Sequence, residues 1–446
     1  MLSLYIHIPF CASKCAYCSF NSFPVVGLID WELQITNYVE ALKKEIDHYA
    51  EVLKDKEVKT LYFWGWTPSR IESWRIIDIV EYIRMKFDLE NLAELSIELN
   101  PYPEAEVLKF IQVVNKKYEQ VSRVRYSFGI QSFDDEVLKV TWRAYSFSGV
   151  VEFLRSLVKF KKDNTVFNFD FIAFGKFQVS KNGYKQLWHE FKREFFQKFL
   201  ESWYVDSVSL YTLEGLKDGL DEIGAKATKG QKDIKGKSFS PLAPFNPLLP
   251  PSRHGSDEDI MEEFTLLKDS ILNAGFKRYE ISNFAKASKA SIHNMVYWNM
   301  ENYLWLWLSA SSFFNHQWLI NNPATFQRFN TCLPVGKVST FQHSWVRWTN
   351  TADLKQYIEW HRIDEKEVHV LNESDILIEE FFLRLRTHEG IADIGKFKNI
   401  LIPNYQWLIT NYQWAWLVSF DGKKLQLTDS GMNVSNSIIT DLLLKI

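Results

Sequence analysis

Three of the four cysteines in this 446-residue chain lie within one short stretch, Cys11-Ala-Ser-Lys-Cys15-Ala-Tyr-Cys18. The stretch directly follows the apolar run Leu4–Ile8, so the thiols are expected on a loop at the end of a strand. Soft sulfur ligands select iron–sulfur clusters or zinc. Three thiolates would leave one iron of a [4Fe–4S] cube without a protein ligand. A substrate or cosubstrate could bind the metal at that open corner.

A structural zinc site is the alternative interpretation of the same stretch. His7 or Cys332 would then supply the fourth ligand of a tetrahedral site. Zinc loops usually come as two close pairs of ligands, and the sequence has no second cysteine pair. The ligand spacing therefore favours the iron–sulfur cluster over zinc.

The bulk composition is that of an ordinary globular protein, and it narrows the classes of partner. Hydrophobic residues make up 46% of the chain and charged residues 24%. The formal net charge of −3 argues against a basic surface for nucleic acids. Residues 1–9 lack the basic start of a signal peptide, and no apolar run is long enough to span a bilayer. We therefore expect a cytoplasmic protein with neither a nucleic-acid partner nor an integral membrane segment.

The first half of the chain alternates short apolar runs with segments of helical period. One such segment has apolar residues three and four positions apart, at Val39, Leu42, Ile46 and Tyr49. Alternation of this kind is typical of βα units around a parallel sheet. Six repeats predict the α/β class and a partial, open (β/α)6 barrel with reactive groups at the strand carboxyl ends. The candidate strands are Leu4–Ile8, Thr60–Phe63, Leu95–Leu99, Val124–Gly129, Val166–Ala173 and Val208–Leu213.

The remaining sequence predicts a division into four parts. Residues 1–216 would form the barrel, and residues 217–256, rich in lysine and proline, a linker or surface excursion. Residues 257–350 would extend the barrel. Residues 351–446 would form a C-terminal α+β domain that packs on the barrel or acts as a lid.

Local signals predict several elements within these later parts. Gly275 is well placed to follow a helix, and Tyr279–Phe284 has the pattern of a strand. In the last part a helix is expected from about Ser374. A hairpin with Asp421-Gly422 at a type I′ turn follows it, and a closing helix spans about Ser435–Leu444. This order of helix, hairpin and helix could suggest a winged-helix domain. However, the segment has no excess of basic residues that could bind the phosphates of a nucleic acid.

Polar residues stand at or near the carboxyl ends of successive predicted strands. Each of them alone is weak evidence, since a buried carboxylate at a strand end is more often structural. Acceptors and a guanidinium that follow successive strands in this order could nevertheless converge on one polar ligand. The members of this set, which are selected by their match to the family motifs described below, are Gly65, Thr67, Glu98, Gln131, Arg143 and Asp170.

The cysteine spacing, CxxxCxxC with an aromatic residue before the last cysteine, resembles the radical S-adenosylmethionine (SAM) superfamily. The stretches Trp64–Ser69, Ser96–Pro101 and Tyr126–Phe133 are similar to its GGGTPS, IE(A/L)NP and SxGxQS(F/L) motifs. This resemblance implies a [4Fe–4S] cluster with SAM on its open iron. The cluster ligands would be Cys11, Cys15 and Cys18.

The same resemblance implies a role for each residue around SAM. Gly65 and Thr67 would lie against the methionine end of SAM, and Glu98 and Gln131 would contact the molecule. Arg143 would pair with its carboxylate, and Asp170 would reach the ribose. Tyr5 would contact the SAM carboxylate or the sulfonium.

Later motifs resemble one branch of this superfamily, the heme chaperone HemW family. Tyr279–Ala285 and His293–Trp298 are similar to its YEISNFA and HNxxYW motifs, and Ser209–Tyr211 and Leu427–Ser437 also match. The sister family, oxygen-independent coproporphyrinogen dehydrogenase or HemN, carries an N-terminal extension and another cysteine after the triad. Here Ser19 follows Cys18, which favours the chaperone branch.

Membership of that branch would imply heme binding, cluster-dependent dimerisation or activation, and delivery of heme to respiratory proteins. His293 is the first candidate for a heme contact, because imidazole is a common axial ligand. A core histidine bonded to neighbouring groups is the alternative role. The rival functions are coproporphyrinogen III dehydrogenase and a degenerate relative that keeps only the fold.

The sequence departs from the family motifs mainly by tryptophan at glycine positions. These are Trp64, Trp66, Trp142, Trp305 and Trp307, and the chain has 17 tryptophans against 18 glycines. Phe174 and Lys176 also stand where the family has glycine and proline. Tryptophan disfavours positive φ and fills space that a ligand would need. We therefore expect the cluster site to survive and SAM binding to be weakened or blocked.

Overall fold

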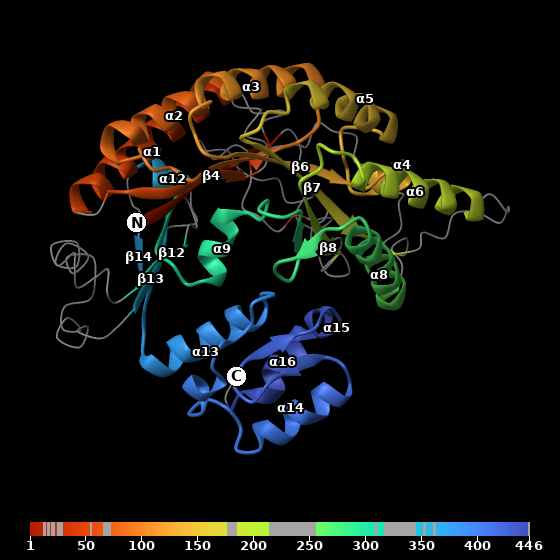
Figure 1. The fold of residues 1–446 in the computed structure, drawn as a ribbon. Coiled ribbons are helices and arrows are strands. Elements are labelled where there is room, and N and C mark those ends of the chain that lie inside the picture. Colours follow the sequence, from red (N-terminus) through yellow and green to blue (C-terminus); the bar gives the residue numbers. More distant parts are fainter. Residues whose placement is uncertain are drawn as a thin grey trace, which may run out of the picture.

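The described part of the chain folds into one long curved sheet with helices along its outer face and a smaller unit below (Figure 1). The structure is a computed structural model. It describes residues 1–11, 15, 18, 23–24, 30–53, 56–65, 73–175, 185–213, 256–307, 311–315, 345–350, 354–359 and 363–444.

The centre of the sheet is parallel, because helices connect its successive strands. Neighbouring strands run in the order β1-β4-β5-β6-β7-β8, and each neighbouring pair is parallel. All six predicted strands and the open α/β barrel are thus confirmed. The strands are β1 (Leu2–Ile8), β4 (Val58–Gly65), β5 (Glu94–Leu99), β6 (Val124–Gln131), β7 (Thr165–Ala173) and β8 (Ser207–Thr212).

Further strands extend the sheet to 12 on both sides without closing it. β11 (Tyr303–Leu306) pairs parallel with β1, and β12 (Ser311–Phe314), β13 (Trp345–Asn350) and β14 (Ile363–Leu371) follow antiparallel. β10 (Asn283–Ala285) and β9 (Lys277–Arg278) complete the opposite edge. The predicted strand Tyr279–Phe284 was therefore only partly right. Residues 279–282 form a connection between two short strands, in which Tyr279 N–H donates to the Asn283 carbonyl.

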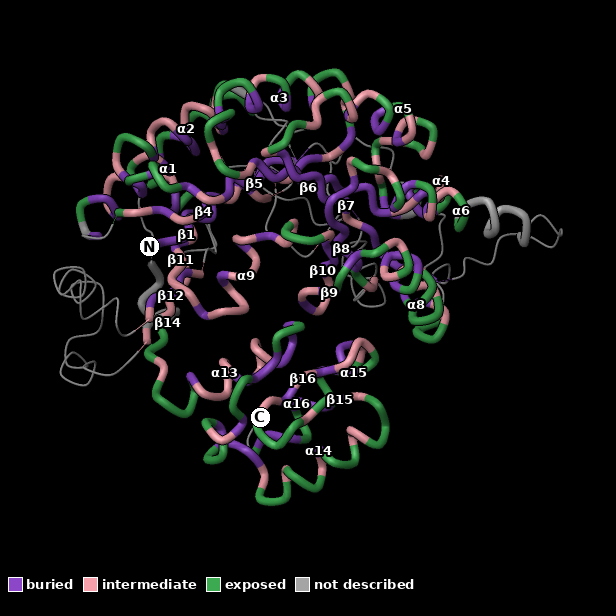
Figure 2. Tube along the Cα trace, viewed as in Figure 1, coloured by how far each residue is buried: buried purple, intermediate pink, exposed green. Residues whose placement is uncertain are grey.

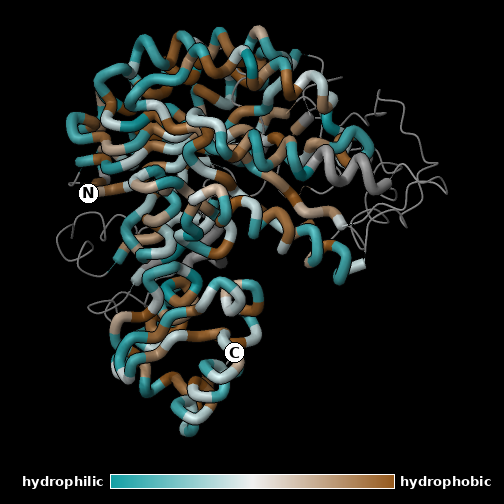
Figure 3. Tube along the Cα trace, turned by 45° about the vertical axis from the view of Figure 1, so that its right-hand side comes forward, coloured by the Kyte–Doolittle hydropathy of each residue, from teal (hydrophilic) through white to brown (hydrophobic). Residues whose placement is uncertain are grey.

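The outer helices are amphipathic, and their apolar faces cover the sheet. The expected period is confirmed in the first of them, where Val39, Leu42, Ile46 and Tyr49 are all buried. Figure 2 shows the buried strands beneath exposed helix surfaces, and Figure 3 shows hydrophobic and hydrophilic segments alternating along these helices. The helices are α1 (Trp31–Val52), α2 (Ser73–Lys86), α3 (Glu104–Lys117), α4 (Asp135–Val140), α5 (Phe147–Leu157), α6 (Lys185–Leu200) and α8 (Asp257–Asn273).

The unit below the sheet has a hydrophobic cluster of its own, running from Phe381 to Leu443 in the chain. The predicted helix, hairpin and closing helix are confirmed as α13 (Glu373–Leu385), β15–β16 and α16 (Ser435–Leu442). The other elements are α9 (Ile292–Trp298), α12 (Leu354–Ile358), α14 (Tyr405–Trp414), α15 (Asp429–Asn433), β15 (Val418–Phe420), β16 (Leu425–Leu427), β2 (Phe10–Cys11) and β3 (Phe23–Pro24).

The hairpin turn lies one residue later than predicted. Asp421 N–H donates to the Lys424 carbonyl, which leaves Gly422 and Lys423 as the central residues. Gly422 has φ 97°, whereas neither Asp421 nor Lys423 has positive φ. Glycine at the first central position matches a type II′ turn, not the predicted type I′. The Asp421 carboxylate accepts from the N–H groups of Lys423 and Lys424, and this fixes the shifted corner.

The division into four parts stays a prediction. The expected excursion at 217–256 lies almost wholly outside the described residues. β13 and β14 lie on either side of the expected boundary at residue 350 and pair with each other. Among the described helices, none has the length and apolar character to cross a membrane.

Candidate functional site

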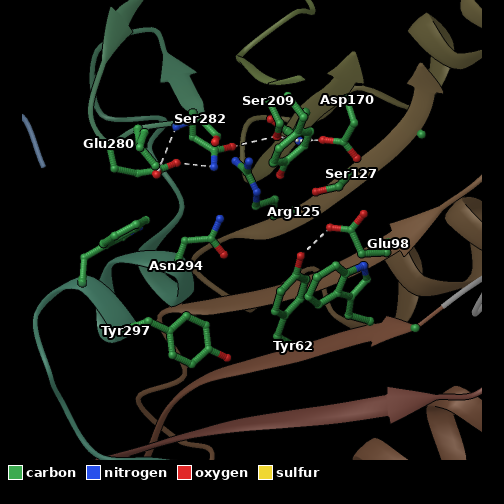
Figure 4. A pocket seen from close by; sticks show the side chains of 18 of the residues that line it. Tyr62, Glu98, Arg125, Ser127, Asp170, Ser209, Glu280, Ser282, Asn294 and Tyr297 are labelled. Atoms are coloured by element: carbon green, nitrogen blue, oxygen red, sulfur yellow. Dashed lines mark hydrogen bonds between the residues drawn. The ribbon is translucent and has the colours of Figure 1, made fainter. Parts of the chain in front are cut away.

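A cavity of about 730 Å³ lies at the carboxyl ends of the parallel strands, and residues of α13 line it on the side of the smaller unit. Its upper wall is formed by residues at the ends of β4 to β8, and α9, β11 and α13 complete it. Figure 4 shows several of these side chains pointing into one space. Strand ends of this kind are where α/β barrels carry their reactive groups.

Most of the predicted ligand residues line this single cavity. They come from five separate segments of the sequence, and Cys18 of the cysteine stretch lines it as well. Thr67 and Trp66 lie outside the described residues. The lining residues predicted from the sequence are Gly65, Glu98, Gln131, Arg143 and Asp170.

Gly65 brings the β4 end close to the end of β1. Its φ is 128°, and a Cβ atom there would lie 2.0 Å from the carbonyl oxygen of Ile8. No side chain fits at such a separation, so this position requires glycine. The close approach holds the strand that precedes the cysteine stretch against the wall of the cavity.

Gln131 has an acceptor that no described residue satisfies. Its Oε1 atom is buried without a hydrogen-bond partner in the described part of the chain, and the side chain lines the cavity. The backbone at Gln131 is left-handed, with φ 65°, where β6 shifts register against β7. An orphaned buried acceptor in a polar cavity suits a ligand that donates hydrogen bonds, such as the amino or hydroxyl groups of SAM.

Two carboxyl groups, Glu98 and Asp170, face the cavity from β5 and β7. The Tyr62 hydroxyl donates to Glu98 Oε1, and Asn168 Nδ2 donates to Asp170 Oδ1 at 2.8 Å. Burial and the nearby Asp170 carboxylate raise the pKa of Glu98 to about 8. Burial also raises the pKa of Asp170. Simultaneous ionisation of both carboxyl groups is therefore unfavourable unless a cation enters the cavity.

Arg125 is the buried cation of this region. Its side chain is 3% exposed, and Nη1 donates to Ser207 Oγ at 2.9 Å. The guanidinium opposes the rise in pKa of both Glu98 and Asp170. Neither Arg125 nor Tyr62 was among the residues predicted for the site. The sequence did contain one signal for Arg125, because it lies inside the predicted apolar strand Val124–Gly129. A charged side chain in such a strand must face either a polar cavity or a partner of opposite charge.

Arg143 lies beside Asn100, which directly follows β5. Its Nη1 donates to Asn100 Oδ1 at 3.0 Å, and its guanidinium stands 5.8 Å from the ring of Tyr145. Arg143 directly follows Trp142 at the end of α4. The arginine is thus held near the cavity wall by a helix end and an amide.

Tyr5 is buried in the sheet and does not belong to the residues that line the cavity. Its hydroxyl bonds to His7 Nδ1 at 2.8 Å, and its ring lies 4.4 Å from that of Trp305. The structure therefore does not place Tyr5 in the wall of the cavity where the other predicted SAM contacts lie. The geometry supports His7 as a structural partner of Tyr5.

The cysteines occupy positions that suit a cluster. Cys11 and Cys15 are each 4% exposed, Cys18 lines the cavity, and Cys18 N–H donates to the Cys15 carbonyl. Within the described ranges, no three His, Cys, Asp or Glu side chains are grouped as ligands of one metal ion. A [4Fe–4S] cube needs no such group, because each thiolate binds a different iron. The donor set and the placement of Cys18 fit the cluster.

His293 is fully buried at the start of α9, below the cavity wall. Its Nδ1 bonds to Thr60 Oγ1 at 2.7 Å and its Nε2 to the Tyr297 hydroxyl at 2.6 Å. Burial lowers its pKa from 6.5 to about 3. Both ring nitrogens are occupied, so this arrangement favours the core histidine over the heme ligand.

Glu94 is a buried carboxylate that ties β5 to the start of α9. It accepts from the N–H groups of Ile292 and His293 at 3.1 Å each. Burial alone would raise its pKa, but the Arg125 guanidinium and these N–H groups hold the pKa below its ordinary value. The carboxylate caps the helix that carries Asn294 and Tyr297 into the cavity.

The raised pKa of Glu98 gives a testable pH dependence. The folded chain keeps the Glu98 proton up to about pH 8, whereas the unfolded chain releases it above the ordinary value of 4.5. The stabilising effect of that proton is complete below pH 4.5 and is lost as the pH rises to about 8. We expect Glu98→Gln to gain melting temperature relative to the unaltered chain across this range. Parallel thermal melts from pH 5 to 8.5 test it, and equal pH profiles would contradict it.

Known proteins resemble this chain in sequence and fold. The radical SAM superfamily model matches residues 5–176. Heme chaperone HemW of Lactococcus lactis is 24% identical over 453 residues, covering 99% of this chain and 97% of the relative. Heme chaperone HemW of Buchnera aphidicola from Schizaphis graminum is 28% identical over 311 residues, 69% of each chain. Heme chaperone HemW of Escherichia coli is 27% identical over 303 residues, 68% of each.

One solved structure matches almost the whole chain. It is described as coproporphyrinogen III oxidase (HemN) from Escherichia coli, a radical SAM enzyme, and superposes with a TM-score of 0.66 at 19% identity. The match covers 99% of this chain and 89% of that one. At this identity the likeness shows the fold. The resemblance that the motifs indicated is confirmed in both sequence and architecture.

Proposed function

We propose that this protein is a heme chaperone. The premise is that residues 5–176 form a radical SAM domain and that the chain is a relative of proteins named heme chaperone HemW. It binds heme and passes it to acceptor proteins, of which respiratory heme proteins are the expected class. A [4Fe–4S] cluster and SAM serve as its cofactors. Dimerisation remains a prediction from the resemblance, and a cytoplasmic location remains a prediction from the sequence.

The chain's own residues supply the ligands and the surroundings of these cofactors. Cys11, Cys15 and Cys18 would hold the cluster, and a bound cluster would supply a single electron to SAM. Gln131 would accept a hydrogen bond from SAM at its orphaned Oε1 atom. Glu98 and Asp170 would balance the positive charge of SAM in their ionised forms, so that binding of the cation would be coupled to release of the proton that the raised pKa of Glu98 retains.

One observation carries this proposal. Polar residues from different strands and strand ends line a single cavity, and Cys18 lines it as well. Gln131 contributes a buried acceptor that lacks a partner among the described residues. Structural carboxylates and amides at strand ends are normally satisfied within the protein, so an orphaned acceptor there indicates a ligand.

The lower part of the cavity offers an apolar and aromatic lining for heme. Trp298, Met300, Phe313 and Leu383 line this part. Arg347 also lines it and pairs with Glu379. Heme is a flat apolar macrocycle that carries two carboxylates. Hydrophobic walls could pack against its ring, and a guanidinium at the edge of the cavity could pair with a carboxylate.

Tryptophan side chains limit the room for SAM in the chain as it stands. Trp64 and Trp305 line the cavity, and the ring of Trp64 lies 6.2 Å from that of Tyr62 in a stacked arrangement. We expect the reduced, reconstituted protein to cleave SAM to 5′-deoxyadenosine slowly or not at all. Chromatographic analysis of SAM cleavage tests this, and cleavage at the ordinary rates of radical SAM enzymes would contradict it.

The chaperone function is tested by mixing the reconstituted protein with heme and, separately, with coproporphyrinogen III. A stable Soret band that persists through gel filtration, without porphyrinogen turnover, is the expected result. Arg347→Gln should weaken that band, while Arg155→Gln, an exposed arginine on α5, should leave it unchanged. Turnover of the porphyrinogen would favour the dehydrogenase instead. Neither heme binding nor turnover would favour a degenerate relative.

A further inference from the structure

Three tryptophans have backbone conformations that L-amino acids rarely adopt. Trp142 has φ 59°, Trp416 has φ 58° and Trp307 has φ 149°. All three values lie in the region that favours glycine, because a Cβ atom there crowds the neighbouring carbonyl. Tryptophan is thus the commonest of the non-glycine residues with positive φ in the described chain, where Asp30, Gln131, Ser288 and Met300 each occur once.

Two of the three tryptophans end helices in the way that a glycine of the same chain does. Gly275, with φ 88°, follows α8 and donates to the Leu272 carbonyl, while the next N–H reaches back to Ile271. This pair of hydrogen bonds is the Schellman motif, whose left-handed residue is usually glycine. Trp142 repeats the pattern after α4, donating to Lys139 while Arg143 N–H donates to the Leu138 carbonyl.

Trp416 repeats it after α14. Its N–H donates to the Gln413 carbonyl at 3.0 Å, and Leu417 N–H donates to the Tyr412 carbonyl at 2.9 Å. The side chain of Trp416 is 82% exposed, so burial of the indole does not offset the strained backbone. Met300 ends α9 in the same manner, which shows that the fold can accept a side chain at such an end.

Trp307 has a different environment but a similar conflict. It is 2% exposed and stacks on His7, with ring centroids 3.9 Å apart. Its indole N–H has no hydrogen-bond partner within the described residues. A buried tryptophan normally satisfies that donor, so both the backbone and the side chain fit this position poorly.

We propose that positions 142, 307 and 416 are glycine positions of this fold, and that the chain made by the source organism carries glycine there. The inference is independent of the proposed function, since it rests on backbone conformation and helix-end hydrogen bonds. A codon change accounts for all three sites at once. UGA is read as tryptophan in one genetic code and as glycine in another, so a UGA-for-glycine gene translated by the first code acquires tryptophan at glycine positions. The nearly equal numbers of tryptophan and glycine, 17 and 18, are consistent with this.

A matched pair of variants on α14 tests the conformational part. Trp414 and Trp416 are 81% and 82% exposed and lie two residues apart, but only Trp416 has positive φ. Trp416→Gly should raise the melting temperature by about 1 °C through relief of the left-handed strain. Trp414→Gly should lower it, because glycine disfavours the helical backbone. Trp142→Gly should raise it as well, and the two gains should add because the sites end two different helices, α4 and α14, that lie far apart in the sequence.

A melting temperature lowered by both Trp416→Gly and Trp142→Gly would overturn the glycine assignment. The codon part is decided separately by mass spectrometry of the endogenous protein. Peptides spanning positions 142, 307 and 416, isolated from cells of the source organism, should have masses that fit glycine. Masses that fit tryptophan at these positions would contradict the proposal, whatever the variants show.

Discussion

Replacing Cys15 by serine should abolish assembly of the iron–sulfur cluster. A serine hydroxyl is a hard, poorly ionised donor, whereas the irons of such clusters are bound by thiolates. Cys15 is 4% exposed, so solvent cannot readily take the place of the missing ligand. After anaerobic reconstitution, we expect the broad iron–sulfur absorption and the bound iron to fall to the background of an unreconstituted sample.

Cys332→Ser is the matched control, since it removes the one cysteine outside the stretch. This variant should keep its full iron content and absorption if the triad alone holds the cluster. Equal loss in both variants would support the alternative in which Cys332 is the fourth ligand. A Cys15→Ser protein that still assembles a complete cluster would contradict the ligand assignment.

Replacing Arg125 by methionine should have the largest effect on stability, a loss of about 3–5 kcal/mol. Arg125 is buried among carboxyl groups, and its guanidinium favours the charged forms of Glu94, Glu98 and Asp170. Its removal would leave those carboxylates without a buried cation. The loss should shrink as the pH falls and the carboxyl groups take up protons.

Denaturant unfolding at pH 5 and pH 8 measures this effect. Arg155→Met, on the exposed face of α5, is the control and should change stability by less than about 0.5 kcal/mol. A similar small change for Arg125→Met at both pH values would show that the cavity carboxyls do not depend on this guanidinium. A loss that grows at low pH would contradict the assigned direction of the pKa effects.

Local pattern was enough to predict the centre of the fold. The parallel strands are buried on both faces and so read as apolar runs, as in β1, where every residue is buried. An extension of the barrel by residues 257–350 was predicted, but the individual strands β11 to β14 were not. β14 contains Asp364, Glu365, Lys366 and Glu367, a polar run without apolar alternation. Its place in the sheet depends on pairing with β13, which no local signal carries.

The site was predicted where a residue's position along a strand fixes its position in space. Glu98, Gln131 and Asp170 lie in the carboxyl-terminal halves of parallel strands, whose ends meet at one edge, so their convergence in one cavity could be expected. The environment of each residue could not. That both nitrogens of His293 are occupied by Thr60 and Tyr297 depends on side chains up to 233 residues away. The contact between the rings of Tyr5 and Trp305 likewise joins residues 300 positions apart in the sequence.

The most direct test of the central claim is an electron paramagnetic resonance spectrum of the reduced, anaerobically reconstituted protein, with iron and zinc counted in the same sample. The account predicts a reduced [4Fe–4S] signal and iron in place of zinc, both lost in Cys15→Ser. A protein that binds zinc, or no metal, and gives no cluster signal would contradict it.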